Sequence, residues 1–386
     1  MAELAADHPF SLTHGGPFFR LLRRIRLVAP RGSIRWFWLV PIAWLPIVIA
    51  SAVRLISGDP LGAVVLDPSV HVRLLVSMPL LLIAERLLDE RVERVTYVMR
   101  TERLADRTRV ERILAGAERL RDSSIVEAVF AVLVVARSQA MLWGGVSPFG
   151  LVHGIEDLRG APVETLWYVG FGLPLLNFLM LRWLWQWLLW VSVLVRFARL
   201  PLDINGMHPD GAAGLKILSM PTSAFATFVA SLTCIASATW SAKILRDETT
   251  LQAFIPTFVV ITLLAVVLGC GPLMFTSPQV CRARHRDLSR YHAFAHEYVE
   301  QFRATWLAGD PRGMSILGLS DIQSLNDLGG SYSTTERTSM FPFGVRTLVT
   351  LWMGVLVPVL PVVLSSMPIT EVAEHLGKML LGGLPT

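Results

Sequence analysis

The stretch TLWYVGFGLPLLNFLMLRWLWQWLLWVS, residues 165–192, decides the fold class. Arg182 is its only charged side chain, and most of the other residues are apolar. About 20 apolar residues in a helix are enough to cross the roughly 30 Å hydrocarbon layer of a bilayer, and a helix satisfies its own backbone hydrogen bonds there. The stretch therefore predicts a transmembrane helix.

The whole chain has the composition of a polytopic membrane protein. Of its 386 residues, 53% are hydrophobic and only 17% are charged, and the mean hydropathy is +0.53, which excludes an ordinary soluble protein. Seven apolar runs are long enough to span a bilayer, namely residues 36–56, 69–88, 123–144, 165–192, 221–244, 253–275 and 345–365. The second run is the least regular, because it contains Arg73, Pro79 and Glu85. The predicted fold class is all-α, a polytopic transmembrane helical bundle of about seven spans with a small cytoplasmic helical module.

Lysine and arginine are distributed unevenly between the two sets of loops. With a cytoplasmic N-terminus, six, nine, three and eight of these residues, 26 in all, fall in segments 1–35, 89–122, 196–220 and 276–346. The opposite segments, 57–68, 145–164, 245–252 and 366–386, contain only Arg159, Arg246 and Lys378. Cytoplasmic flanks collect positive charge, so we expect a cytoplasmic N-terminus and an external C-terminal tail, residues 366–386. Arginine makes up 32 of the 35 basic residues, a composition that favours a bacterium and hence its inner membrane.

The basic N-terminal segment, residues 1–35, contains an amphipathic pattern. In PFFRLLRRIRLV, residues 17–28, helical spacing separates an apolar face from a basic one formed by Arg20, Arg23 and Arg24. Such a helix is expected to lie on the membrane surface and contact anionic lipid. A disordered basic tail is the alternative.

The cytoplasmic module is expected to consist of two polar helical regions, residues 89–122 and 276–344. In the first, arginines and acidic residues nearly cancel, which indicates a solvated helical hairpin and excludes a nucleic-acid surface. Neither region is large enough to bury a core alone. The partner classes left open for the protein are another protein and, in a homo-oligomer, a second copy of the chain.

Polar side chains within the spans are candidates for function, because ionisable groups are expensive at membrane depth. The candidate polar core comprises Glu127, Arg137, Asn177, Arg182 and Gln186. The third and fourth spans are predicted antiparallel neighbours, so Glu127 and Arg182 are expected to meet. One interpretation is a structural ion pair, and the other is a polar path or binding site.

Two further patterns concern packing. The fourth span is rich in tryptophan, at positions 183, 185, 187 and 190, which is typical of an aromatic belt at the membrane interface. In the fifth span small residues recur every fourth position from Ala226 to Ala242, which predicts the close approach of another helix.

The loop of residues 198–220 contains LDINGMHPDGAAGLKIL, residues 202–218. Asp203, His208 and Asp210 form a candidate cytoplasmic loop site. The His-Pro-Asp triplet is also the signature of J-domains, but those need a soluble helical unit that this loop is too short to provide. We expect Asp210 to accept an N–H from residue 212 or 213, and His208 to point away from the following helix. The alternative is a ligand site beside the glycines.

The motifs HPDGAAGL at 208–215, SDIQSLNDLGGSY at 320–332 and SMFPFG at 339–344 extend this pattern along the second half of the chain. Together they resemble a group of bacterial polytopic inner-membrane proteins that have a His-Pro-Asp loop. The resemblance implies a polytopic membrane fold, and it supplies no activity and no catalytic residues. This sequence departs from the pattern at Ala213, where a second glycine is expected.

Signals for enzymes and metals are weak. His285, His292 and His296 have helical spacing that suits a metal, but a solvated helical face explains them better, and Cys234, Cys270 and Cys281 form no CxxC pair. Nucleotide-binding and hydrolase motifs are absent from the sequence, so we expect no cofactor and no metal.

The leading functional hypothesis is a channel or transporter-like protein, with the polar core lining its interior. The alternative is a non-transporting scaffold or signalling component that binds a cytoplasmic or membrane partner, and a membrane-embedded enzyme comes third. Transport predicts a hydrated cavity at Glu127, Arg137 or Arg182. A scaffold predicts a dry bundle and exposed apolar side chains on the cytoplasmic helices.

Overall fold

The computed structural model describes residues 10–27, 36–102, 104–144, 161–246, 249–308 and 320–366. Within these ranges all regular structure is helical, so the all-α fold class is confirmed. Most of the expected external loop 145–164 and nearly all of the tail 366–386 lie outside the described residues.

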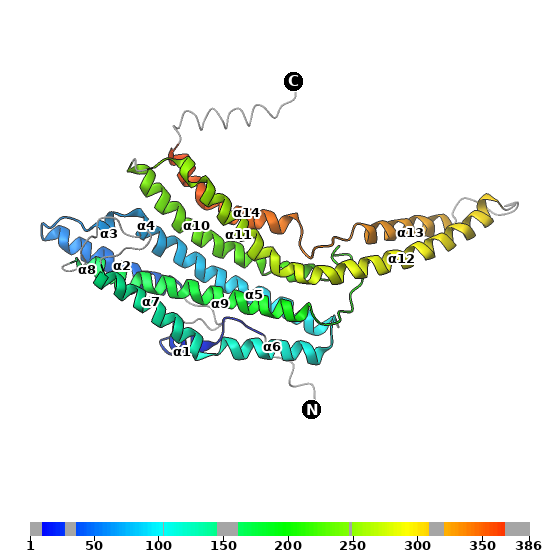
Figure 1. The fold of residues 1–386 in the computed structure, drawn as a ribbon, viewed down its shortest axis with the longest axis horizontal. Helices are drawn as coiled ribbons and strands as arrows, with labels where there is room; N and C mark the ends of the chain where they lie inside the picture. Colours follow the sequence, from blue (N-terminus) through cyan, green and yellow to red (C-terminus); the bar gives the residue numbers. More distant parts are fainter. Residues whose placement is uncertain are drawn as a thin grey trace, which may run out of the picture.

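The helices follow one another in the order drawn in Figure 1. The N-terminal half contains α1 (Gly16–Arg24), α2 (Trp36–Ile56), α3 (Ala63–Leu66), α4 (Pro68–His71), the π-helical η1 (Val72–Ser77), α5 (Met78–Thr101), α6 (Arg107–Arg121) and α7 (Ser124–Gly144). The middle contains α8 (Val163–Trp167), the π-helical η2 (Tyr168–Gly172), α9 (Leu173–Phe197), the 3₁₀ turn η3 (Lys216–Ser219) and α10 (Thr222–Leu245). The last part contains η4 (Leu251–Phe254), α11 (Ile255–Cys270), η5 (Gly271–Thr276), α12 (Ser277–Phe302), η6 (Arg303–Leu307), α13 (Ser320–Glu336) and α14 (Val345–Ser366).

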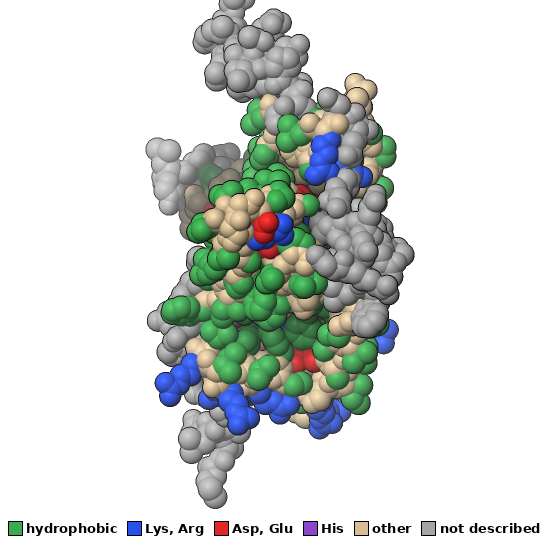
Figure 2. Space-filling model, turned by 90° about the vertical axis from the view of Figure 1, so that its left-hand side faces the viewer, with side chains coloured by type: hydrophobic (Ala, Val, Ile, Leu, Met, Phe, Trp, Pro, Cys, Tyr) green, Lys and Arg blue, Asp and Glu red, His purple; other side chains and the backbone are tan. Residues whose placement is uncertain are grey.

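Six helical runs are long and apolar enough to cross a membrane, namely Trp38–Ile56, Arg107–Ala140, Val163–Phe197, Lys216–Leu245, Leu251–Leu307 and Val345–Leu364. Their outer faces expose apolar side chains such as Ile49, Leu263 and Val357. Figure 2, which views the end of the molecule where α3 and α8 lie, shows mostly hydrophobic side chains with few charged ones among them. The protein is therefore a helical membrane protein.

The second expected span, residues 69–88, is helical but is not among the six candidates. It belongs to the run α4–η1–α5, which continues through position 88 to Thr101 without a break at the predicted boundary. This run packs against α9 and α10 inside the bundle, and Leu74, Leu81 and Leu88 are buried there. A count of seven spans thus stays a prediction.

A long pair of helices projects from the bundle (Figure 1). The helical run from α11 through η5, α12 and η6 is continuous from Ile255 to Leu307, and α13 lies alongside α12. The Tyr298 hydroxyl donates to the Asp321 carbonyl oxygen at 3.2 Å, and Trp306 Nε1 donates to the Asp321 carboxylate at 3.2 Å. We call α12, η6 and α13 the arm.

The small-residue pattern of α10 does allow another helix to approach closely. A Cβ added to Gly354 of α14 would lie 2.6 Å from the Ala226 carbonyl oxygen, so the two backbones nearly touch. On another side of α10, Ser77 and Ser231 donate to one another's carbonyl oxygens at 3.0 and 2.9 Å. The packing predicted from the small residues is therefore confirmed.

The tryptophans of α9 do not form the predicted aromatic belt. Trp183, Trp187 and Trp190 are buried in the bundle, and the Trp183 ring stacks on Phe228 of α10 with ring centroids 3.9 Å apart. They face inward because α9 lies in the middle of the bundle, between α5, α6 and α7. They are core residues.

Candidate functional site

A cluster of four ionisable side chains and one amide is buried where α5, α7 and α9 meet. Its members are Glu85 and Asp89 of α5, Glu127 of α7, and Arg182 and Gln186 of α9, and each of them is at most 8% exposed. Helical geometry brings them together, because residues four apart lie on the same face of a helix. We call this group the buried charge cluster.

Arg182 is the centre of the buried charge cluster. Its guanidinium pairs with the Glu85 carboxylate, lies 3.4 Å from Glu127 Oε1 and donates to the Thr13 carbonyl oxygen at 2.9 Å. The Gln186 amide also donates to Glu85, at 3.2 Å. Because a buried charge is tolerated only when it is paired and hydrogen-bonded, these contacts account for Arg182 at this depth.

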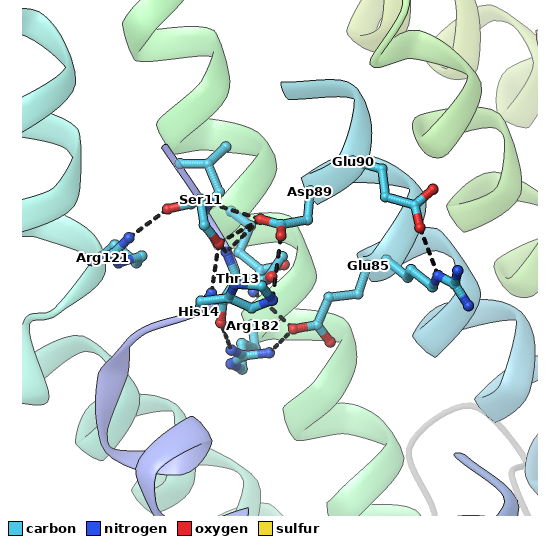
Figure 3. Close-up of polar contacts among 11 residues, drawn as sticks. Ser11, Thr13, His14, Glu85, Asp89, Glu90, Arg121 and Arg182 are labelled. Carbon is cyan, nitrogen blue, oxygen red and sulfur yellow. Dashed lines mark hydrogen bonds and ion pairs between the residues drawn. The ribbon is translucent and has the colours of Figure 1, made fainter. Parts of the chain in front are cut away.

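The N-terminal segment, Phe10–Gly15, lies against this cluster in a non-helical conformation (Figure 3). Asp89 Oδ1 accepts from the Ser11 hydroxyl at 2.6 Å and from the backbone N–H groups of Leu12 and Thr13 at 3.1 and 3.3 Å. Arg121 of α6 donates to the Ser11 carbonyl oxygen. Phe10 and Leu12 are fully buried beside these polar contacts.

The structure brings only some of the predicted polar residues together. The expected meeting of Glu127 and Arg182 is confirmed, and Gln186 joins them through Glu85. Arg137 and Asn177 are half-buried, and within the described residues neither one forms a hydrogen bond or ion pair with the cluster. Asn177 is five positions from Arg182, which turns it to a different face of α9.

Sequence reasoning missed Glu85, Asp89 and the N-terminal segment. In the sequence, Glu85 lies near the end of the second expected span. Its spacing of four residues from Asp89 places both carboxylates on one helical face, and this spacing was the signal for the cluster. The N-terminal segment binds largely through backbone atoms, which leave no pattern of side chains in a sequence.

A second buried polar contact joins the two π-helical segments. Arg73 of η1 donates to the Tyr168 hydroxyl of η2 at 2.9 Å, and both side chains are almost fully buried. Nearby, Glu164 of α8 is fully buried and lies 3.3 Å from the Arg54 guanidinium of α2. These contacts connect α2, η1 and the α8–η2 run at the end of the bundle opposite the arm.

The His-Pro-Asp loop is folded around Asp210. Its carboxylate accepts backbone N–H groups of Ala212 at 2.9 Å, Gly214 at 3.0 Å and Lys216 at 3.0 Å, so the bond expected from residue 212 is confirmed. Partial burial alone would raise the pKa of Asp210, but these three N–H groups and His208 outweigh it and hold that pKa below its usual value. The carboxylate thus organises the turn.

His208 does not point away as expected. Its Nδ1 lies 2.9 Å from Asp210 Oδ1, because the turn brings the ring back over the carboxylate that shapes it. Ala213, where the resemblance leads us to expect glycine, has φ +56°, in the left-handed region that favours glycine. The departure from the pattern therefore falls at a strained position.

The same loop is bonded to the arm. Asp287 of α12 accepts the Gly206 N–H at 2.7 Å, the Thr338 hydroxyl donates to the Gly206 carbonyl oxygen at 2.8 Å, and the Ser339 N–H donates to the Gly211 carbonyl oxygen at 2.8 Å. The loop also contacts the turn between α5 and α6, where the Asp203 N–H donates to the Leu104 carbonyl oxygen at 2.9 Å. It therefore holds the base of the arm against the bundle.

A groove of about 500 Å³ opens between this loop and α12. Its lining includes Asp203 and Met207 from the loop and Arg286, Arg290 and Phe294 from α12. Arg286 is already paired with Asp287 at 2.9 Å and donates to the Ile204 carbonyl oxygen. Met207 and Phe294 expose 42% and 57% of their surface, so the groove combines apolar side chains with the cation of Arg290. His208 and Asp210 do not line it.

The histidine spacing of α12 does not assemble a metal site within the described part of the chain, where no group of three or more potential ligand residues converges. His285 Nδ1 instead lies 2.8 Å from the Cys281 carbonyl oxygen, one turn earlier on the same helix. The contact is local to the helix surface.

Comparison of the chain with protein-family models, curated proteins and solved structures finds no match. The geometry of the molecule is therefore what supports a function. The resemblance to inner-membrane proteins with a His-Pro-Asp loop stays a prediction.

Proposed function

We propose that the protein is a non-transporting membrane scaffold or signalling component, and that the groove beside the arm binds a protein partner. One observation carries this proposal. The groove presents exposed Met207 and Phe294 together with Arg290, next to an arm that is fixed to the bundle by the loop. Exposed apolar side chains rimmed by polar groups are typical of interaction sites.

The state of the buried charge cluster also favours this class over transport. Arg182 is neutralised by Glu85 and Glu127, and the N-terminal segment occupies the space beside it. Trp183 and Trp187 fill another face of α9, where their rings pack against Phe228 and Phe225 of α10. An ion pair of this kind fixes helix packing without any need for a substrate path.

Site-specific photocrosslinking in cells tests the proposal. A photoreactive phenylalanine derivative would replace Met207 or Phe294 in the groove, and Tyr97, which is 65% exposed on α5 and does not line the groove, serves as control. We expect one discrete crosslinked protein from the groove positions and none from the control. Arg290→Glu should weaken that crosslink, whereas Arg282→Glu, on an α12 residue outside the groove, should not. Equal crosslinking from all positions would contradict a specific site.

A channel or transporter-like protein is the second candidate. Ionisable groups at membrane depth are functional candidates by default, and Arg73, Arg182 and Glu85 all lie within the helical bundle. π-helical segments such as η1 and η2 are often found at functional sites. Flux of small ions into proteoliposomes that is lost in Arg182→Met but kept in Arg86→Met would favour this function.

The proposed location is the inner membrane of a bacterium, with a cytoplasmic N-terminus, seven spans and an external C-terminus. The uneven distribution of lysine and arginine supports this orientation, which puts the arm and the His-Pro-Asp loop in the cytoplasm. Reporter fusions after Met220 and after Thr386 should report cytoplasmic and external locations, respectively. Fusions that report the two locations reversed would mean that the run α4–η1–α5 does not cross, because both fusion points follow it.

Contact of α1 with anionic lipid is also proposed. Arg20, Arg23 and Arg24 are exposed on this helix beside Leu21 and Ile25, which expose 55% and 53% of their surface. An exposed face that combines basic and apolar side chains suits the anionic leaflet. Replacing the three arginines with glutamine should lower the affinity of the protein for anionic lipid without changing the fold of the bundle.

A further inference from the structure

The contacts between the N-terminal segment and the bundle are made largely to the backbone of the segment. Asp89 accepts the N–H groups of Leu12 and Thr13, Arg182 donates to the Thr13 carbonyl oxygen, and Arg121 donates to that of Ser11. Main-chain hydrogen bonds of this kind give a peptide-binding site its affinity, and pockets for side chains give it specificity. The bundle thus contains a site that binds the backbone of a bent segment, in which Asp89 Oδ1 accepts two successive N–H groups and the Ser11 hydroxyl accepts those of Thr13 and His14.

Two apolar anchors complete this arrangement. The Phe10 side chain is 1% exposed and that of Leu12 is fully buried, whereas His14 reaches the edge of the site, with Nε2 3.4 Å from Asp89 Oδ2. The segment therefore fills a site in which four successive residues are buried, the apolar Phe10 and Leu12 together with the polar Ser11 and Thr13.

The segment is attached to the rest of the chain only through α1. This helix has nine residues, too few to be stable alone in water, and only Gly16, Phe19 and Leu22 are buried. Phe18 adds one bond at the same site, because its N–H donates to Glu127 Oε2 at 2.7 Å. Among the described residues, the segment and α1 form no backbone–backbone hydrogen bond with α5, α7 or α9, so these helices keep their own bonds without them.

We propose that the N-terminal segment is a detachable occupant of a peptide-binding site formed by Glu85, Asp89, Arg121, Glu127 and Arg182. When it leaves, the carboxylates and guanidinium groups become available to a second peptide of the same kind. The ligand class is a peptide with a tight bend that offers two successive N–H groups to Asp89 and a carbonyl oxygen to Arg182. The proposal is independent of the groove beside the arm.

A cleavable full-length protein tests this without a folding defect. A protease site inserted after Leu27 allows the chain to fold intact and then separates residues 1–27 from the bundle. The purified, cut protein is mixed with a dye-labelled synthetic peptide of residues 1–27. We expect the labelled peptide to replace the original piece and to remain bound during size-exclusion chromatography.

The incorporation of two variant peptides tests whether the buried side chains of the segment determine its binding. Leu12→Asp puts a carboxylate into a fully buried position beside Asp89 and should lower incorporation by about 100-fold, because an unpaired buried charge is very costly. Arg26→Asp puts a carboxylate at an exposed position just after α1 and should be incorporated like the wild type. A cut piece that never exchanges would overturn the proposal, as would equal incorporation of the Leu12→Asp peptide.

Discussion

Arg182 holds several buried groups at once, so its replacement should destabilise the protein more than the loss of any one partner. Only 4% of its side chain is exposed, and those of Glu85 and Glu127 are 11% and 9% exposed, so solvent screens these charges little. Arg182→Met leaves both carboxylates buried without their cation, which typically costs about 3–5 kcal/mol. We expect a loss of this size in the free energy of unfolding.

Replacing the two carboxylate partners of Arg182 should lower the free energy of unfolding by different amounts, less for Glu127 than for Glu85. Glu127→Gln removes the longer contact, at 3.4 Å, and still leaves an acceptor for the Phe18 N–H, so we expect a loss of about 1.5 kcal/mol. Glu85→Gln removes the nearest carboxylate and should cost more, about 3 kcal/mol. The double variant Glu85→Gln/Arg182→Met should be less destabilised than the sum of its single variants, by about 1–3 kcal/mol.

Reversible denaturant unfolding in lipid–detergent micelles, followed by tryptophan fluorescence, measures these differences. The matched control is the pair Arg86 and Glu90 on the same helix, whose side chains are 58% and 52% exposed and whose atoms lie 2.7 Å apart. Breaking this exposed pair should cost at most about 0.5 kcal/mol. If losses at Glu85 and Arg182 simply add, or if Arg86→Met costs as much as Arg182→Met, the reasoning fails.

Three other perturbations follow from local geometry. Gly354→Ala puts a Cβ 2.6 Å from the Ala226 carbonyl oxygen, so α14 must shift. We expect the free energy of unfolding to fall by about 1–3 kcal/mol in the same assay. The control is Gly344→Ala, where the added Cβ meets open space. Ala213→Gly relieves a left-handed alanine and should raise stability by up to about 1 kcal/mol, whereas a loss would show that φ +56° carries no strain. Because the pKa of Asp210 is lowered by folding, its contribution to stability is present above the unfolded value of 3.8 and is lost as pH falls below it. Thermal unfolding of Asp210→Asn should therefore depend less on pH below about 4 than that of the wild type, and equal pH dependence would argue against the bonded carboxylate.

The helices could be predicted from the length of their apolar runs, and the close approach of α14 to α10 from the spacing of small residues in α10. Both signals lie within the sequence of a single helix. The meeting of Glu127 and Arg182 was also predictable, since a short connection makes their spans antiparallel neighbours. Among the described residues, Arg137 and Asn177 form no bond with this group. The sequence alone could not separate them from it, because a span shows which residues are polar but not which face turns toward a given neighbour.

The rest required the folded chain. The N-terminal segment has no periodic pattern. Asp89 and Arg182 bind its backbone N–H and carbonyl groups, which nearly every residue has, so the side chains of the segment do not predict these contacts. The contact of His208 with Asp210 depends on a turn in which Gly211, Ala213 and Gly214 have positive φ. Alanine rarely adopts positive φ, so the sequence does not predict this turn. Likewise, the groove exists only because Asp287 brings α12 to the loop.

The two helices of the arm are connected to different membrane helices, α12 to α11 and α13 to α14. With 26 residues at 1.5 Å each, α12 is about 39 Å long, so a change of about 10° in its tilt moves its far end by about 7 Å. The tilt of membrane helices responds to the thickness of the bilayer. Because α12 continues α11 through η5 without a break, a lipid environment that changed the tilt of α11 would move the far end of the arm by several ångströms.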